Sequence, residues 1–221
     1  MTTEASYPPR PNVLPRAEPV LIAAVPVILA GLWAAKLAGA SITGGELVVI
    51  AVRLALPLLI LRYWLAGGIV AMLIDAADVI LIEIVGLGGF GNHYAETDKL
   101  LDSWYYVLEL VVAWRWANPW MRIPTIGLFS YRLVGALLFE AWGAHVLLFI
   151  FPNLFENWWL YCVVVMKWFP GAVPTNWKST LIPLVALLVP KMAQEYLLHF
   201  AEAHPWDWTK DHILSPIGIE I

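Results

Sequence analysis

The feature that most constrains this chain is a series of seven long apolar segments. A bilayer core about 30 Å thick needs about 20 apolar residues per spanning helix, and most of the segments approach or exceed that length. Short breaks rich in Gly, Pro and Asn separate them. The segments are Pro19–Ala40, Leu47–Ala66, Gly68–Gly86, Leu100–Trp116, Ile123–Phe151, Leu154–Trp168 and Ser179–Phe200.

This pattern predicts the fold class. With 61% hydrophobic and 14% charged residues, the chain is neither an ordinary soluble domain nor a disordered one. In lipid only helices and closed barrels satisfy their own backbone hydrogen bonds, and the runs lack the period-two alternation of a barrel. We therefore predict an all-α, polytopic integral membrane bundle of six or seven transmembrane helices, placed in the bacterial inner (cell) membrane.

The breaks also predict the domain organisation. Residues 1–18 contain four prolines and read as an extended tail. Residues 19–203 form a single transmembrane domain, and 204–221 form an interfacial C-terminal tail. We expect a tight hairpin at Gly67-Gly68 and a strong tilt or a break at Gly143 in the long fifth segment. Ala38-Gly39-Ala40 resembles a cleavage site, but the preceding apolar run is too long for an export signal, which favours a retained helix.

The positions of the tryptophans and the net charge indicate which binding partners to expect. Many of the 13 tryptophans lie near segment ends, as in an aromatic belt at the membrane surface, although stacking on a ligand stays open. The net charge of -4 is spread out, so we expect membrane lipids and no nucleic acid. A homo-oligomer or a membrane complex is left open. The tryptophans near segment ends are Trp64, Trp104, Trp116, Trp120, Trp168, Trp177, Trp206 and Trp208.

Acidic residues interrupt two of the apolar segments. Asp75 and Asp78 are three residues apart and Asp98 and Asp102 are four apart, so each pair shares a helix face. Glu109 continues the second stripe deeper in the membrane, where we expect it to pair with an arginine. A carboxylate at membrane depth costs roughly 2.5–3.5 kcal/mol on insertion scales, which makes it a functional-site hypothesis by default. Two helices joined by the Gly-rich loop Gly86–Glu96 would turn these acids towards each other.

Three kinds of partner could compensate these carboxylates. Divalent cations are the first, and oxygen-only ligands suit Mg²⁺ or Mn²⁺. Arginines are the second, with Arg53, Arg132 or Arg115 pairing individual acids as structural bridges. A proton or ion pathway is the third.

The spacing Asp75-x2-Asp78 followed by Asp98-x3-Asp102 resembles the signature of the CDP-alcohol phosphotransferases, D-x2-D-G-x2-A-R-x8-G-x3-D-x3-D. The Arg53–Pro57 run and Trp177–Thr180 are similar to flanking elements of that family. The resemblance implies two divalent ions held by the aspartates and bound to the donor diphosphate. Carried over, Asp75, Asp78, Asp98 and Asp102 would be metal ligands, and Asp102 is either a ligand or the catalytic base.

The chain also departs from that signature. Val79 replaces the first glycine, Ile82-Glu83 replaces the Ala-Arg pair, and Tyr94 stands at the second glycine. With seven spans, the basic residues of the later loops place the Gly-rich loop outside by the positive-inside rule. The family's site is cytoplasmic, so orientation stays open.

Several other polar residues lie in the apolar segments, away from the two aspartate pairs. Lys191, Glu195 and His199 recur every four residues, which is typical of an ion-pair stripe and compatible with a Glu–His metal site. Glu140 lies deep in the fifth segment, and Arg132 is its first candidate partner. Cys162 is the sole cysteine, which excludes a disulfide framework and a cysteine-based metal site.

From these residues we predict metal-assisted transfer of a phospho-alcohol group in lipid metabolism, with a CDP conjugate or a pyrophosphate lipid as donor. Phosphoryl chemistry depends largely on positioning and on neutralisation of charge, and clustered aspartates with Mg²⁺ can supply both. A proton- or cation-coupled transporter and a non-catalytic membrane subunit are the alternatives.

Overall fold

The computed structural model describes residues 44–84, 94–144 and 146–199, together with positions 208, 212 and 215. Side chains are described at 49–76, 101–139, 141–144 and 146–197 and at those three positions. Every regular element in this part of the chain is a helix, which confirms the all-α class. The first apolar segment, the N-terminal tail and most of the Gly-rich loop lie outside the described residues.

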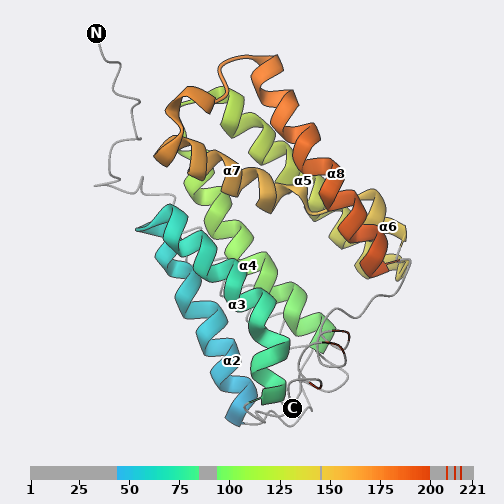
Figure 1. The fold of residues 1–221 in the computed structure, drawn as a ribbon. Coiled ribbons are helices and arrows are strands. Elements are labelled where there is room, and N and C mark those ends of the chain that lie inside the picture. The colour runs from blue at the N-terminus through green and yellow to red at the C-terminus, as the bar shows by residue number, and fades with distance from the viewer. Residues whose placement is uncertain are drawn as a thin grey trace. The chain divides into compact units, whose positions relative to one another are not determined.

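The chain divides after Arg115 into two compact units. Whether these units form the single domain expected over 19–203 stays a prediction. The first unit contains α2 (Gly44–Ala55), the 3₁₀ helix η1 (Leu56–Leu61), α3 (Trp64–Ile84) and α4 (Tyr94–Trp114) (Figure 1). The second contains α5 (Pro119–Trp142), α6 (Val146–Ile150), α7 (Leu154–Trp168), the 3₁₀ helix η3 (Pro170–Ala172) and α8 (Trp177–His199).

In the first unit, α3 and α4 both pack against η1 and against each other. The buried face of α4 follows helical periodicity through Leu101, Trp104, Leu108 and Val112. Glu109 lies beside this stripe and is fully buried. An acidic side chain is therefore built into the apolar face that holds α4 in its unit.

The second apolar segment is not one helix, contrary to the expectation for Leu47–Ala66. The α-helix ends at Ala55 because Pro57 has no N–H and opens a 3₁₀ turn. The carbonyl of Leu54, three residues before the proline, accepts a hydrogen bond of 2.9 Å from Trp104 Nε1. A side chain of α4 thus satisfies a backbone group at the point where the helix changes its geometry.

The predicted hairpin at Gly67-Gly68 is wrong, because both glycines lie inside α3. The chain turns at Arg62 and Tyr63, whose backbone N–H groups donate to the Leu59 carbonyl at 3.0 and 2.7 Å. Gly67 has a different role. A Cβ added there would lie 2.3 Å from Ile60 N and 2.5 Å from Leu59 C, so the missing side chain lets α3 rest on the backbone of η1.

The second unit is built around α7, whose Phe155, Trp158, Trp159 and Cys162 are at most 1% exposed. The predicted break at Gly143 is confirmed. Helix α5 ends at Trp142, and Gly143 adopts φ 66°, a left-handed conformation that glycine accepts without steric cost. Its N–H donates to the Phe139 carbonyl at 2.7 Å and closes the helix.

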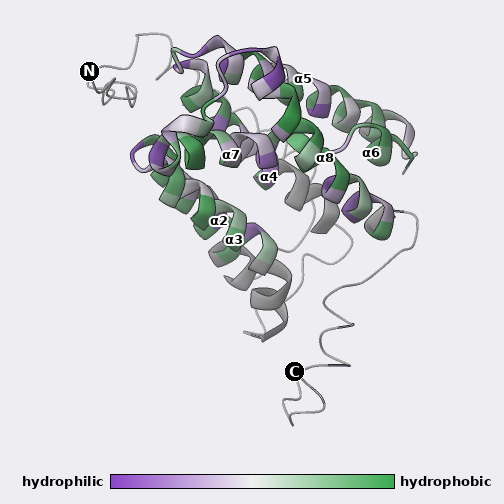
Figure 2. Cartoon of the chain, turned by 45° about the horizontal axis from the view of Figure 1, so that its top comes forward, coloured by the Kyte–Doolittle hydropathy of each residue, from purple (hydrophilic) through white to green (hydrophobic). Residues whose placement is uncertain are grey.

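Two helical stretches among the described residues are long and apolar enough to cross a membrane, Pro119–Phe139 and Val146–Trp168. The second of them includes α6, the break before α7, and α7 itself. The Pro119–Phe139 stretch turns large apolar side chains outward, with Ile123 63% and Leu137 62% exposed. Figure 2 shows the apolar residues that run along α5 and α8.

The tryptophans expected in an aromatic belt differ in exposure. Trp64, Trp104 and Trp116 are at most 8% exposed and belong to the core of their units, so their rings pack against protein, and the belt stays a prediction. Their positions at segment ends did not reveal which way the rings point. Trp206 lies outside the described residues. The exposed members of the set are Trp120, Trp168, Trp177 and Trp208.

The close approach of α3 to η1 predicts the outcome of a glycine substitution. Gly67→Ala should lower the free energy of unfolding by about 1–3 kcal/mol, because the new methyl group meets backbone atoms that cannot move independently. Gly127→Ala is the matched control, since a Cβ there meets nothing within 4 Å. The control should be neutral or up to about 1 kcal/mol more stable, because alanine favours the helix. Denaturant titration of the detergent-purified variants, followed by circular dichroism, measures both; equal stabilities would contradict the packing described here.

Candidate functional site

Arg53 lies in the last turn of α2 and is only 4% exposed. A guanidinium group stays charged at every physiological pH, so its burial needs acidic or carbonyl partners. Pro57 shortens α2 just beyond it, and η1 then leads the chain into the turn that brings α3 back along α2. The local sequence therefore places a permanent positive charge inside a helical unit.

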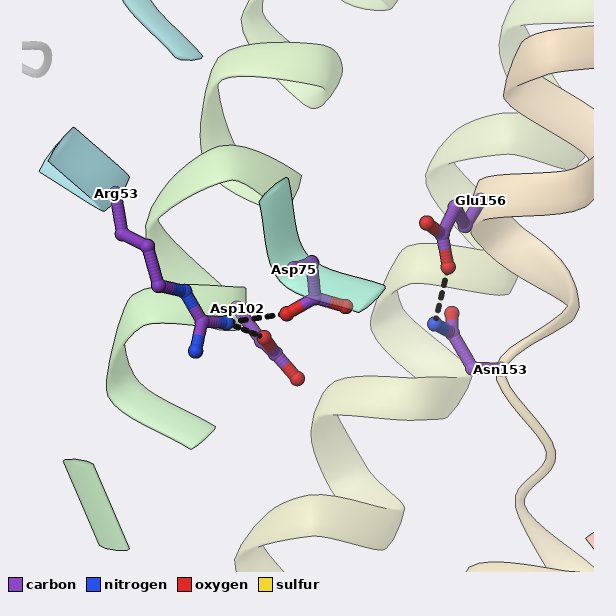
Figure 3. A network of polar contacts seen from close by, with 5 residues as sticks. All are labelled: Arg53, Asp75, Asp102, Asn153 and Glu156. Atoms are coloured by element: carbon purple, nitrogen blue, oxygen red, sulfur yellow. Dashed lines mark hydrogen bonds and ion pairs between the residues drawn. The ribbon is translucent and has the colours of Figure 1, made fainter. Parts of the chain in front are cut away.

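The partners of Arg53 come from two other helices. Its Nη2 donates to Asp75 Oδ1 on α3 and, at 2.6 Å, to Asp102 Oδ1 on α4 (Figure 3). We call Arg53, Asp75 and Asp102 the arginine-bridged cluster. The side chains of Asp75 and Asp102 are 28% and 23% exposed. One guanidinium group thus joins α2, α3 and α4, and the two carboxylates remain accessible from outside.

Two predictions meet at this cluster. The structural alternative, in which Arg53 pairs individual acids, is confirmed for Asp75 and Asp102. The two aspartate pairs also converge in part. Asp75 from the first pair and Asp102 from the second contact the same atom, Nη2 of Arg53. The side chains of Asp78 and Asp98 lie outside the described ones, so the four-aspartate metal site stays a prediction. Within the described part of the chain, no three His, Cys, Asp or Glu side chains gather as metal ligands.

The charges of the cluster do not balance within it. One guanidinium faces two carboxylates, which leaves one excess negative charge when both acids are ionised. Seven residues beyond Asp102 on α4, Glu109 adds a fully buried carboxyl group. Asp75, Asp102 and Glu109 therefore place three carboxyl groups in the unit that contains Arg53. The predicted pairing of Glu109 with an arginine stays a prediction.

A second polar network lies in the other unit. Lys191 Nζ and Glu195 Oε1 on α8 are 3.1 Å apart, which confirms the ion-pair stripe for these two residues. Glu195 Oε1 also accepts from the backbone N–H of Asn153 at 3.3 Å, and Asn153 Nδ2 donates to Glu156 Oε2 at 3.1 Å (Figure 3). The side chain of His199 is outside the described ones, so a Glu–His metal site stays a prediction.

Sequence reasoning did not identify Asn153 as a member of this network. The available signal was its position between Pro152 and the first turn of α7, where polar residues often satisfy backbone groups. Arg132, proposed as the partner of Glu140, donates from Nη1 to the Phe151 carbonyl at 2.9 Å. The Glu140 side chain is outside the described ones, and its pairing stays a prediction.

No protein-family model, curated protein or solved structure matches this chain. The resemblance to the CDP-alcohol phosphotransferases stays a prediction carried by the spacing of four aspartates.

The arginine bridge predicts a stability effect. Arg53→Gln leaves two carboxylates facing each other without their shared cation, and we expect a loss of about 3 kcal/mol in the free energy of unfolding. Arg53→Lys should lose less, because it keeps a positive charge, although its shorter side chain places that charge farther from the two acids. Arg62→Gln is the matched control: Arg62 is exposed and stacks on Tyr63 with its Cζ 5.9 Å from the ring centroid.

A double-mutant cycle separates the bridge from general damage. Combining Arg53→Gln with Asp102→Asn should cost less than the sum of the single changes by about 1–3 kcal/mol, because the second change removes a stranded charge. Denaturant titration of the four proteins measures this coupling. Strict additivity, or an effect of Arg62→Gln equal to that of Arg53→Gln, would rule out the bridge as a stabilising contact.

Proposed function

We propose that this chain is a polytopic integral membrane protein of six or seven helices whose arginine-bridged cluster is its functional site. The site binds a divalent cation, Mg²⁺ or Mn²⁺, and transfers a phospho-alcohol group to or within a membrane lipid. The observation that supports this proposal is the meeting of Asp75 and Asp102 at one guanidinium group. These residues come from the two aspartate pairs that the phosphotransferase signature requires, and both are partly exposed.

The chemistry of the donor atoms suits this reaction. Carboxylate oxygens are the ligands that hard divalent cations prefer. Asp75 and Asp102 would hold the cation with Asp78 and Asp98 completing the set, and the bound cation would neutralise phosphate oxygens. Asp102 is also the candidate base, as an alternative to its role as a ligand. Arg53, which belongs to a run similar to a flanking element of the family, adds a positive charge beside them.

Arg53 has a specific consequence in this proposal. While it binds both aspartates it occupies the place that a cation would take between them, so cation binding competes with the bridge. Loading of the site should therefore loosen the contact of α2 with α3 and α4. The bridge keeps the unit stable when the site carries no substrate.

Two rival functions are favoured by the same contacts. A proton- or cation-coupled transporter is supported by Glu109, because a fully buried carboxyl group two helical turns from Asp102 is a typical element of a proton path. A non-catalytic membrane subunit is supported by the ion pairs of Asp75 and Asp102 with Arg53, because such contacts can hold three helices together without taking part in a reaction. In that case the bridge is purely structural.

Cation binding and transfer test the proposal directly. Mn²⁺ binding to the detergent-purified protein is followed by electron paramagnetic resonance, and transfer from a labelled CDP-alcohol to a lipid acceptor is assayed with Mg²⁺. Asp102→Asn should weaken Mn²⁺ binding at least about tenfold and slow transfer by about 10²–10⁴, the usual contribution of a general base. Glu156→Gln, an equal change of charge in the other unit, should leave both within about twofold.

The rival functions give different results. Unchanged transfer in Asp102→Asn, with a normal unfolding midpoint, would contradict the catalytic role. Proteoliposome flux that needs Asp102 and Glu109 but no divalent ion would establish the transporter. A partner that co-purifies in stoichiometric amount, with no cation binding or flux, would establish the subunit.

A further inference from the structure

The second unit carries an open apolar groove of about 400 Å³ between the first turns of α5 and α8. Two tryptophans stand at its mouth, and aliphatic side chains and prolines form its walls. We call it the α5–α8 groove. Its main lining residues are Trp120, Ile123 and Pro124 from α5 and Trp177, Leu181 and Leu184 from α8.

A proline and a threonine determine the floor of the groove. Pro124 lies inside α5 and lacks the N–H that would bond the carbonyl of Trp120. The hydroxyl of Thr180, a residue that is 6% exposed, lies 3.4 Å from this carbonyl and 2.9 Å from the Asn176 carbonyl. Asn118 Nδ2 adds a bond of 2.7 Å to the Pro174 carbonyl. The two helix starts are therefore held side by side, with the groove above Thr180.

The walls of the groove are apolar and open. Ile123 is 63% exposed, Leu181 49% and Trp177 59%. Ile123 also belongs to the Pro119–Phe139 stretch, which is long and apolar enough to cross a membrane. A concave surface of this composition fits a hydrocarbon chain better than it fits water.

The charged side chains in the segments around the groove are basic. The described segments 116–124 and 165–181 contain no acidic residue, and their charged side chains are Arg122, Lys167 and Lys178. Lys178 Nζ lies 5.5 Å from the centroid of the Trp177 ring at the groove itself. Helix α7 shows the same polarity, with Glu156 in its first turn and Lys167 in its last. Positive charge is thus concentrated where α7 ends and where α5 and α8 begin.

We propose that the α5–α8 groove is a binding site for an anionic phospholipid. One acyl chain lies in the groove against Ile123, Leu181 and Leu184, and the phosphate group lies beside Lys178. Tryptophan rings such as Trp120 and Trp177 suit this level, because they place an apolar ring and an N–H donor at the boundary of lipid and water. The charge selects anionic over zwitterionic lipid, since each basic residue at an anionic membrane surface contributes about 1 kcal/mol.

This site is independent of the arginine-bridged cluster. It rests on the membrane location in the proposed function, and it involves none of the aspartates. Loss of lipid binding at the groove should leave Mn²⁺ binding unchanged, so the two proposals fail or succeed separately.

Native mass spectrometry of the full chain, titrated in detergent with dioleoylphosphatidylglycerol or dioleoylphosphatidylcholine, tests the proposal. The unaltered protein should bind the anionic lipid more tightly. Lys178→Gln should weaken that binding about fivefold and leave the zwitterionic lipid unaffected. Leu184→Trp, which fills the groove, should weaken both. Arg62→Gln is the control for charge and Val185→Trp, on a half-exposed site outside the groove lining, is the control for bulk; both should stay within about twofold.

Three results would overturn the proposal. The first is equal affinity of the unaltered protein for the two lipids, and the second is an equal effect of Lys178→Gln and Arg62→Gln. The third is unchanged lipid binding in Leu184→Trp accompanied by a change in oligomeric state, which would assign the groove to a second copy of the chain. The unfolding midpoint of each variant shows whether it is folded. If Leu184→Trp has a lower midpoint than Val185→Trp, the comparison of Lys178→Gln with Arg62→Gln decides the test.

Discussion

Burial of the Arg53 guanidinium is the constraint on which the first helical unit depends. The group cannot lose its charge, so the unit must provide carboxylates wherever the side chain ends. Asp75 and Asp102 do this from two different helices. Removing one partner of such a buried ion pair lowers the free energy of unfolding by more than the pair contributes to it. The reason is that the other charge remains in apolar surroundings without its partner. The contacts of Arg53 with these aspartates therefore stabilise the unit. They also bring three charged side chains together.

Prolines change the helices of both units, because a proline has no backbone N–H to donate. Pro57 ends α2 as an α-helix and starts the 3₁₀ turn that lets α3 return beside it. The Leu54 carbonyl near this change is satisfied by Trp104. Pro124 has no N–H to donate to the Trp120 carbonyl, and this carbonyl accepts from the hydroxyl of Thr180. In each case a side chain from another helix contacts a backbone carbonyl within four residues of the proline, so an interruption in one helix becomes a contact with another.

The second unit separates its charges along its helices. Glu195, Asn153 and Glu156 form a polar network to which Lys191 also belongs, whereas Lys167 and Lys178 lie beside exposed tryptophans where α7 ends and α8 begins. Apolar surface between these levels is turned outward along α5 and α8. In the proposed membrane location, the exposed tryptophans and lysines of this unit would lie at the surface of an anionic leaflet.

The sequence by itself determined the helical class, the break at Gly143, the ion pair of Lys191 with Glu195, and the candidacy of Arg53 as the partner of the acids. These follow from local rules: apolar run length, the freedom of glycine at positive φ, and the spacing of residues on one helix face. Tertiary structure decided the remainder. Whether Trp104 is exposed or buried, why Gly67 lacks a side chain, and which aspartates share Arg53 depend on neighbours that are distant in sequence. Periodicity gives the face of a helix, but only packing shows what that face meets.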